Sequence, residues 1–481
     1  MSTRLPASPR RSPAGLRGDA AGVSTMRYDA IIIGSGQAGN PLWDSLTERG
    51  WTVALIEQAH LGGTCINLGC TPTKTMVASA QVAHYARQAV RWGVRTGEVT
   101  VDLPRIVARK DAVVQQFRGG KESQAAGRTN LYLYRGHARF VGPDRVAVGE
   151  QVLEGARIFI NTGTRPEIPR IDGLDTVPYL TNESLLELKT LPEHLLVLGG
   201  GYIGLEFGQM FRRFGSRVTV VHKSGQILNR EDADVAGELQ KALAAEEIRF
   251  VLNARTTRAA RENGQVVLTL ELPGGPETLS GSHLLLATGR RPNTDDLGLD
   301  QAGVATDRQG YVKVNGRLET SVPGIWALGD VKGGPAFTHI SYDDYQIVYG
   351  NLLEGKSLSV EGRIVPYSVF TDPQLGRVGL TEKEARATGR KLKVGTIPMT
   401  YVARAIERDE TAGLMKLIAD GETDQILGAA VLATEGGELV HILEALMLAR
   451  APYTVLKGAI YIHPTLAEGF FSLMDEVKAA A

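Results

Sequence analysis

The sequence predicts an α/β protein in which one strand–glycine–helix–strand unit occurs twice. The chain has 481 residues, which is enough for about three domains at ~150 residues each. Glycine accounts for 56 of them, or about 12% against a usual ~7%, without a collagen-like period. Two short apolar runs each lead into a glycine-rich loop, a helical stretch and a second apolar run. This order is typical of two nucleotide-binding β-α-β units.

The first unit begins with the apolar strand 28–33 (YDAIII), which enters the loop GSGQAG, and the next strand covers 52–57. In such a loop the first glycine allows a tight turn and the second lets a pyrophosphate approach the backbone. The third glycine lets the helix pack on the strand, and Glu57 can accept hydrogen bonds from ribose hydroxyls. The three glycines are Gly34, Gly36 and Gly39.

The second unit repeats this pattern with strands at 194–198 and 217–221. Its loop glycines are Gly199, Gly201 and Gly204. Eighteen residues separate the third glycine from the ribose-contacting position in both units, which places His222 where the first unit has Glu57. A carboxylate there repels a 2′-phosphate, whereas cations attract it. His222 and the following Lys223 therefore predict a preference for NADPH over NADH, unless both belong to an ordinary solvated loop.

Only two cysteines occur, Cys65 and Cys70, which excludes a disulfide scaffold and a cysteine-rich structural metal site. In a regular helix their Cα atoms would be ~8–9 Å apart, and a disulfide needs less than about 7 Å. A bridge therefore requires distorted backbone, which neighbouring glycines and a proline permit. The segment predicts a strained, reducible loop of the catalytic kind; the alternative is two inert buried thiols.

Charge and the N-terminal segment limit the partners. The 53 Lys and Arg balance 53 Asp and Glu, so we expect neither nucleic acid nor an anionic membrane as partner. No apolar run is long enough to span a membrane. Residues 1–26 are rich in Arg, Ser and Pro, and we expect a disordered extension or a start codon upstream of the true one, with a transit peptide disfavoured. Two unbridged cysteines would suit a cytoplasmic location.

The segment GGTCINLGCTPTK (62–74) resembles the redox-active motif of the flavoprotein disulfide reductases, the class I pyridine nucleotide-disulfide oxidoreductases. That family includes dihydrolipoamide dehydrogenase, glutathione reductase and mercuric reductase. Further segments resemble its other motifs in the family's order, over about residues 27–475. They are NTG at 161–163, ATGR at 287–290, GIWALGD at 324–330 and PYSVFTDP at 366–373.

The resemblance implies two Rossmann-like dinucleotide-binding domains, for FAD and NAD(P), and a C-terminal α+β dimerisation domain. The FAD domain would be split by the insertion of the second nucleotide unit. The expected limits are 27–165 and 283–365 for FAD, 166–282 for NAD(P)H and 366–481 for dimerisation.

The resemblance also implies roles for individual residues. Cys70 would be the flavin-side thiolate that forms a charge-transfer complex, and Cys65 the interchange thiol that meets the substrate. Lys74 would lie near flavin N5 with Glu206 as its salt-bridge partner, since a cation there favours reduced flavin and the thiolate. The remaining cofactor contacts implied are Gly63, Thr64, Thr162, Gly163 and Asp330 for FAD, and Gly289 for NADPH.

His463 lies in YIHPTLAE, which resembles the family's HPTxxE signature. There the histidine, oriented by a glutamate at the position of Glu468, serves the cysteines of the other subunit. Imidazole titrates near neutrality and can carry the proton of a thiol. The resemblance thus implies an obligatory homodimer with a shared active site; the alternative is a buried interface histidine.

We therefore predict an FAD-dependent NAD(P)H:disulfide oxidoreductase that passes electrons from NADPH through FAD and the Cys65–Cys70 pair to a small-molecule disulfide. The alternatives are a mercuric or other metal reductase, a dihydrolipoyl dehydrogenase, a quinone reductase or oxidase, and a redox-sensing module. The C-terminal tail lacks the cysteine pair of mercuric reductases, and Tyr461 replaces a histidine usual in dihydrolipoyl dehydrogenases. We expect no bound metal.

Overall fold

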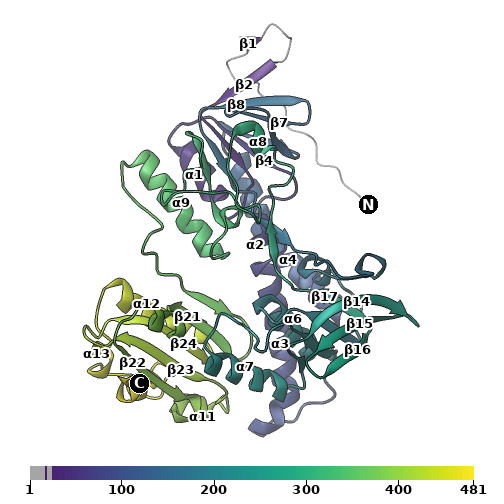
Figure 1. Cartoon of the computed structure of the whole chain (residues 1–481), viewed down its shortest axis with the longest axis vertical. Helices are drawn as coiled ribbons and strands as arrows, with labels where there is room; N and C mark the ends of the chain where they lie inside the picture. Colours follow the sequence, from purple (N-terminus) through teal and green to yellow (C-terminus); the bar gives the residue numbers. More distant parts are fainter. Residues whose placement is uncertain (1–16, 19–23, 481) are drawn as a thin grey trace. The chain divides into compact units, whose positions relative to one another are not determined.

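The computed structural model describes residues 17–18 and 24–480 (Figure 1). The chain forms two compact units, and each is assembled from separate stretches of sequence. It leaves the first unit in β10 (Thr164–Pro166) and returns to it in β18 (Arg290–Pro292). Among the described residues, the first unit comprises 17–18, 24–67, 117–165 and 291–361, and the second comprises 68–116, 166–290 and 362–480.

The first unit contains a parallel five-stranded sheet in the order β19-β9-β3-β4-β5. Its strands are β3 (Ala30–Ile33), β4 (Val53–Glu57), β5 (Leu131–Arg135), β9 (Ile158–Ile160) and β19 (Ile325–Ala327). Every side chain of β3 and β4 is buried, because both faces of a parallel sheet are covered. This explains why the two runs are continuously apolar instead of alternating.

Helices cover one face of this sheet and a second, mixed sheet covers the other. Ile32 and Leu55 pack against α1 (Gly39–Glu48) and α9 (Thr338–Leu353). Ile31 and Ile56 point the opposite way and pack with the second sheet, as the two-residue period of a strand requires. That sheet has the order β1-β2-β8-β7-β6, with bounds Arg17–Gly18, Ser24–Tyr28, Gln151–Gly155, Arg145–Val148 and Ala138–Phe140.

The second unit contains the same plan again. Its parallel sheet has the order β13-β12-β11-β17, with bounds Arg249–Val251, Arg217–Val221, His194–Leu198 and His283–Leu286. Val197 packs on one face against α6 (Tyr202–Phe214) and α7 (Ala233–Ala245). Leu196 packs on the other face against an antiparallel sheet. Its strands are β14 (Arg255–Glu262), β15 (Gln265–Leu272) and β16 (Gly275–Gly281).

The C-terminal part of the second unit is a six-stranded sheet with helices packed on it. Its strand order is β20-β21-β24-β23-β22-β25, all antiparallel. The bounds are Tyr367–Val369, Gln374–Gly379, Ile426–Ala433, Leu414–Asp420, Leu392–Pro398 and Lys478–Ala479. The α12 helix (Gly436–Leu448) and α14 helix (Gly469–Glu476) contribute Val440 and Phe470 to its core.

The remaining helices are short or connect these layers. They are α2 (Gly63–Asn67), α3 (Cys70–Gln88), α4 (Leu103–Ala126), α5 (Asn182–Leu185), α8 (Leu299–Ala302), α10 (Glu382–Ala387), α11 (Ala403–Glu407) and α13 (Thr454–Lys457). The predicted α/β class with two Rossmann-like domains and an α+β C-terminal part is confirmed. The individual domain limits stay predictions.

The N-terminal prediction needs a correction. Residues 24–26, expected to belong to a disordered extension, lie in β2, where Thr25 and Met26 pair with Val152 and Leu153 of β8. The backbone there completes a ladder, which a sequence rich in small polar residues did not indicate. Most of the expected extension, residues 1–16 and 19–23, lies outside the described residues. Within the described part of the chain, no helix is long and apolar enough to cross a membrane.

Candidate functional site

The first glycine loop joins β3 to α1 and is built by close backbone contacts. Gly34 has φ +99°, and a Cβ there would lie 2.4 Å from the carbonyl oxygen of Asn161. A Cβ on Gly39 would lie 2.3 Å from the carbonyl oxygen of Gly34. Larger residues would therefore clash with backbone that cannot move aside. The NTG turn containing Asn161, Thr162 and Gly163 thus lies against the loop, as its position in the motif order predicts.

The second glycine loop, between β11 and α6, repeats these contacts. Gly199 has φ +125° and its Cβ would lie 2.2 Å from the carbonyl oxygen of Ala287. A Cβ on Gly204 would lie 2.1 Å from the carbonyl oxygen of Gly199. Apart from Gly201 itself and its two neighbours in the chain, no atom of the described residues lies within 4 Å of a Cβ built on Gly201. Open space beside a helix N-terminus suits a pyrophosphate, so this loop fits a dinucleotide.

Glu57 closes the first site at the end of β4. Its Oε2 accepts from the backbone N–H of Ser35 at 3.0 Å and from Ser35 Oγ at 2.7 Å, and its Oε1 accepts from Ala59 N–H at 2.9 Å. The carboxylate is therefore oriented by the loop that would hold the phosphates. This arrangement fits the recognition of ribose hydroxyls that the sequence predicts.

His222 occupies the same position in the second site, but as a neutral group. Its Nδ1 accepts from the backbone N–H of Gly200 at 3.1 Å, just as Glu57 accepts from Ser35. Burial and then the neighbouring Lys223 lower the pKa of His222. The expectation that His222 supplies positive charge is therefore not supported, because a ring nitrogen that accepts a hydrogen bond carries no proton. Lys223 is exposed and is the cation at this position.

Other predicted cofactor residues of the first unit gather around the same loop. Gly63, with φ +61°, would place a Cβ 2.6 Å from the Cα of Gly36, so the start of the cysteine segment lies against the glycine loop. Thr64 follows it and is exposed. Asp330 accepts a hydrogen bond from Thr164 Oγ1 at 3.1 Å. These contacts bring the two FAD motifs of the sequence to one edge of the sheet.

Sequence reasoning missed a buried acid behind Asp330. Asp344 of α9 is fully buried, and its Oδ2 accepts from the backbone N–H of Gly329 at 2.8 Å. Lys332 lies 3.2 Å from the same oxygen. Asp344 therefore holds the GD turn in place. An acid inside an otherwise apolar helical face is the signal that could have indicated it.

The two cysteines lie in different helices. Cys65 belongs to α2 and is half-buried, whereas Cys70 is the first residue of α3 and is exposed. Leu68 and Gly69 interrupt the helix between them, and Gly69 has φ −128° and ψ −115°. The predicted break in regular helix is therefore present. Peptide N–H groups at a helix N-terminus favour the thiolate form of a cysteine located there.

Lys74 follows Cys70 by four residues on α3, which places the two side chains on one helix face. Lys74 Nζ lies 2.6 Å from Glu206 Oε2, which confirms the predicted contact. Glu206 is only 4% exposed and Lys74 is 32% exposed. The second oxygen of Glu206 accepts from the backbone N–H of Phe370 at 2.9 Å, and the Phe370 ring centroid lies 4.6 Å from Lys74 Nζ.

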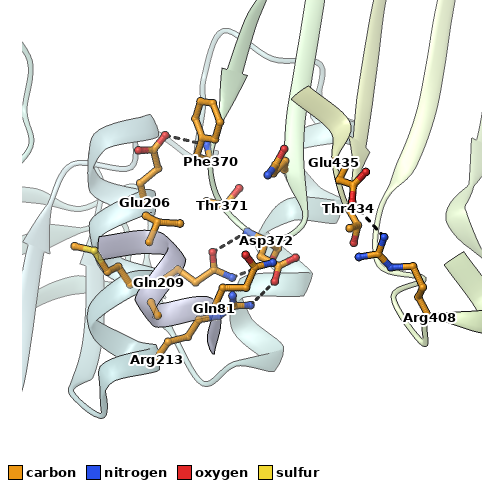
Figure 2. A pocket seen from close by; sticks show the side chains of 14 residues that line it. Gln81, Glu206, Gln209, Arg213, Phe370, Thr371, Asp372, Arg408, Thr434 and Glu435 are labelled. Carbon is orange, nitrogen blue, oxygen red and sulfur yellow. Dashed lines mark hydrogen bonds and ion pairs between the residues drawn. The ribbon is translucent and has the colours of Figure 1, made fainter. Parts of the chain in front are cut away.

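Phe370 and the residues around it were not identified from sequence as part of the site. A cavity of about 180 Å³ lies beside this contact (Figure 2). It is lined by residues of α3, α6 and the segment 370–374, and by Arg408, Thr434 and Glu435. Glu206, Gln209 and Arg213 point toward it from one face of α6. Only the PYSVFTDP motif, quoted for its family resemblance, indicated that this segment matters.

His463 and Glu468 form the predicted pair near the C-terminus. His463 Nδ1 lies 2.9 Å and 3.1 Å from the two carboxylate oxygens of Glu468. The imidazole is 66% exposed, so its other nitrogen is available to a neighbouring molecule. A carboxylate on Nδ1 fixes the orientation of the ring, which suits proton transfer at the other nitrogen.

Within the described residues no three His, Cys, Asp or Glu side chains are grouped to hold a metal ion. The features that can carry chemistry are two nucleotide loops, a cysteine at a helix start with a paired lysine, and an exposed histidine–carboxylate pair. Together they define a nucleotide-dependent redox enzyme.

Two family descriptions match the chain: pyridine nucleotide-disulphide oxidoreductase over residues 28–344, and the dimerisation domain of that family over residues 365–473. The chain belongs to the pyridine nucleotide-disulphide oxidoreductase family. It is accordingly an oxidoreductase of the flavoprotein disulfide reductase type, as the sequence predicts.

Relatives cover nearly the whole chain. The chain is 40% identical over 460 residues to the probable pyridine nucleotide-disulfide oxidoreductase RclA of Escherichia coli (strain K12), covering 94% of this chain and 100% of that protein. It is 38% identical to a mercuric reductase of Streptomyces lividans, and the match covers 94% of this chain and 95% of that protein. A solved Cu(II) complex of the HOCl-induced flavoprotein disulfide reductase RclA from Escherichia coli has a TM-score of 0.85 at 39% identity, covering 93% and 100%.

Proposed function

We propose that this enzyme reduces a small-molecule disulfide with NADPH, using FAD, the Cys65–Cys70 pair and His463. The observation that carries this proposal is Cys70 at the start of α3, with Lys74 one turn further on and fixed by Glu206. Both features stabilise a thiolate, which is the reactive form of cysteine. An inert thiol pair would need neither.

The first nucleotide loop, Glu57 and Asp330 would hold FAD, and the second loop would hold NADPH. Bound FAD supplies two-electron transfer from a nicotinamide to a disulfide. The N-termini of α1 and α6 follow these two loops, and a helix N-terminus favours the phosphates of a nucleotide. The chain's own contribution is therefore to bind and orient the nucleotides and to control the protons of the thiols.

The reduced cysteines would then act in two exchange steps. The Cys65 thiolate attacks one sulfur of the substrate, forming a mixed disulfide and breaking the substrate S–S bond. His463 of a second subunit would donate the proton that the departing thiolate takes. The Cys70 thiolate next attacks Cys65 Sγ, which releases the second half of the substrate as a thiolate, protonated by solvent, and leaves a Cys65–Cys70 disulfide. Two electrons pass from the cysteines to the substrate, so the exchange balances.

A homodimer with a shared active site is the arrangement that would supply this histidine. The family's dimerisation domain is present, and some of the apolar side chains near His463 in the sequence are exposed. They are Ile460, Ile462 and Phe471. Exposed apolar side chains in a contiguous segment are typical of an interface, and a second copy would cover them while receiving His463.

NADPH is the proposed donor because Lys223 is the exposed cation beside the position where Glu57 binds ribose in the first unit. A neutral His222 does not repel a 2′-phosphate, whereas a glutamate would. NADH remains the less favoured donor. We also keep the proposal of a cytoplasmic location, since a chain with two cysteines suits reducing surroundings.

Reduction of a metal ion is a second candidate. Similarity to a mercuric reductase and to a protein solved as a Cu(II) complex favours it. In that case the Cys65 and Cys70 thiolates would themselves meet the ion as substrate. The same site would serve both reactions, so only turnover distinguishes them.

The test is a turnover panel with glutathione disulfide, lipoamide, a quinone, Hg²⁺ and Cu²⁺, each with NADPH and with NADH. We expect a disulfide to give the highest kcat/KM, with NADPH preferred. Cys65→Ala should abolish disulfide reduction and leave NADPH-dependent dye reduction intact. Equal disulfide turnover by Cys65→Ala would refute the cysteine mechanism, and turnover of Hg²⁺ or Cu²⁺ alone would establish the second candidate.

A further inference from the structure

One buried face of α6 binds the segment 370–372 in three successive contacts. Glu206, Gln209 and Arg213 stand at i, i+3 and i+7, which places them on one side of the helix. All three are buried. Figure 2 shows them directed at the segment. Burying a polar side chain costs free energy unless the side chain is hydrogen-bonded. Three buried polar side chains on one helix face are therefore expected to have hydrogen-bonding partners there.

Gln209 makes a pair of opposed hydrogen bonds with the backbone of Asp372. Its Oε1 accepts from Asp372 N–H at 2.8 Å, and its Nε2 donates to Asp372 C=O at 2.7 Å. Nε2 also donates to Glu246 Oε1 at 2.8 Å. The amide therefore bonds both the N–H and the C=O of one residue, as a neighbouring β-strand would, and it fixes the backbone two residues after Phe370.

Arg213 fixes the side chain of the same residue. Its Nη2 lies 2.9 Å from Asp372 Oδ2, and its Nε and Nη2 donate to the two oxygens of Glu246 at 2.8 Å and 2.6 Å. Thr371, between Phe370 and Asp372, is buried and donates from Oγ1 to Pro373 C=O at 2.8 Å. The whole segment is thus held from both its backbone and its side chains.

The segment 370–372 contributes to the position of the Lys74 ammonium. Its ammonium lies between the Glu206 carboxylate at 2.6 Å and the Phe370 ring at 4.6 Å. Lys74 is a flexible side chain that is one-third exposed, so these two neighbours decide where its charge is. A ring attracts a cation only when its face is presented correctly, and the Phe370 ring follows the backbone that Gln209 holds.

We propose that Gln209 is a positioning residue for the Lys74 ammonium, acting through residues 370–372, with Arg213 supporting it. This rests on the proposed function, in which Lys74 stabilises the Cys70 thiolate. Gln209 touches no reacting group itself. Its loss would release the segment, move the Phe370 ring and let the ammonium leave the face of α3 that it shares with Cys70.

The test measures the iodoacetamide alkylation rate of Cys70 across pH in reduced Cys65→Ser protein. Gln209→Met keeps the size of the side chain and removes its hydrogen bonds. We expect alkylation near neutral pH to fall about threefold or more, which corresponds to a rise of about half a unit or more in the pKa of Cys70. The matched control Gln124→Met removes a hydrogen bond to Asp44 elsewhere and should leave the rate unchanged.

Lys74→Met tests the proposed role of Lys74 separately from the positioning role of Gln209. If Lys74→Met lowers alkylation and Gln209→Met adds no further decrease in the double variant, the positioning role holds. An unchanged rate in Gln209→Met with a lowered rate in Lys74→Met overturns it, whereas no effect of Lys74→Met contradicts the proposed role of Lys74. Gln209→Asn, one methylene shorter, is the second variant if Gln209→Met does not fold, with the same outcomes.

Discussion

Gly204→Ala and Gly208→Ala form a matched pair on one helix. Both place a methyl group in α6, and both gain up to about 1 kcal/mol from the better helix propensity of alanine. The Cβ of Gly208 would meet Val218 and Val220 at 3.6 Å and 3.8 Å, which is ordinary contact. The Cβ of Gly204 would meet the Gly199 carbonyl oxygen at 2.1 Å.

The difference between the two variants isolates the strain. The distance between the added Cβ and the Gly199 carbonyl oxygen must increase from 2.1 Å to an ordinary contact of 3.4 Å. Because close-packed backbone cannot yield otherwise, the start of α6 is displaced from its loop by about 1.3 Å. Overpacking of this kind costs roughly 1–3 kcal/mol. At about 2–4 °C per kcal/mol, Gly204→Ala should unfold several degrees below Gly208→Ala. The displaced loop should also raise the KM for NADPH about tenfold, about 1.4 kcal/mol of binding.

Thermal unfolding followed by circular dichroism and steady-state kinetics with NADPH measure both effects. Gly208→Ala should match or exceed the unfolding temperature of the unmodified protein and keep its KM. If the two variants unfold within about 1 °C of each other and share one KM, glycine at 204 is not required by the close approach, and the assignment of this loop to the nucleotide is wrong.

Three further outcomes are expected. Lys223→Glu should shift the kcat/KM ratio toward NADH by about tenfold or more, because a carboxylate repels the 2′-phosphate; an unchanged ratio would remove Lys223 from the site. Burial lowers the pKa of His222, so its neutral form stabilises the fold at neutral pH, and stability falls as pH drops below its ordinary value of 6.5. His222→Asn keeps an acceptor for Gly200 N–H, and its unfolding temperature should fall less between pH 7.5 and 6 than that of the unmodified protein. Mixing refolded Cys65→Ala and His463→Ala subunits should restore about a quarter of full disulfide reductase activity, because half of the dimers contain one intact shared site; no recovery would place His463 outside the partner's site.

Local sequence patterns were sufficient to predict the two nucleotide-binding units. The strands expected at 194–198 and 217–221 are β11 and β12 with the same bounds. Continuous apolar runs predict buried parallel strands because both sheet faces are covered. The glycine positions follow from turn geometry, which is also local. The Lys74–Glu206 pair was predicted only through the family motif, since its members are 132 residues apart.

The charge of His222 shows where such reasoning fails. Beside Lys223 in the sequence it has the composition of a cationic patch. In the fold its ring is buried and accepts a backbone hydrogen bond. Desolvation depends on every segment that packs around a group, and no neighbouring residue in the sequence reports it. The strand formed by residues 24–26 was missed for a related reason, because its pairing partner is β8, more than a hundred residues away.

The sequence by itself determined the two glycine loops, the cysteine pair and the family, since each depends on residues close together in the chain. Only the tertiary structure decided which groups complete the site. Phe370 meets Glu206 across 164 residues of sequence, and Gln209 meets Asp372 across 163. Such contacts depend on how helices and strands pack, because packing brings together side chains whose spacing in the sequence carries no signal.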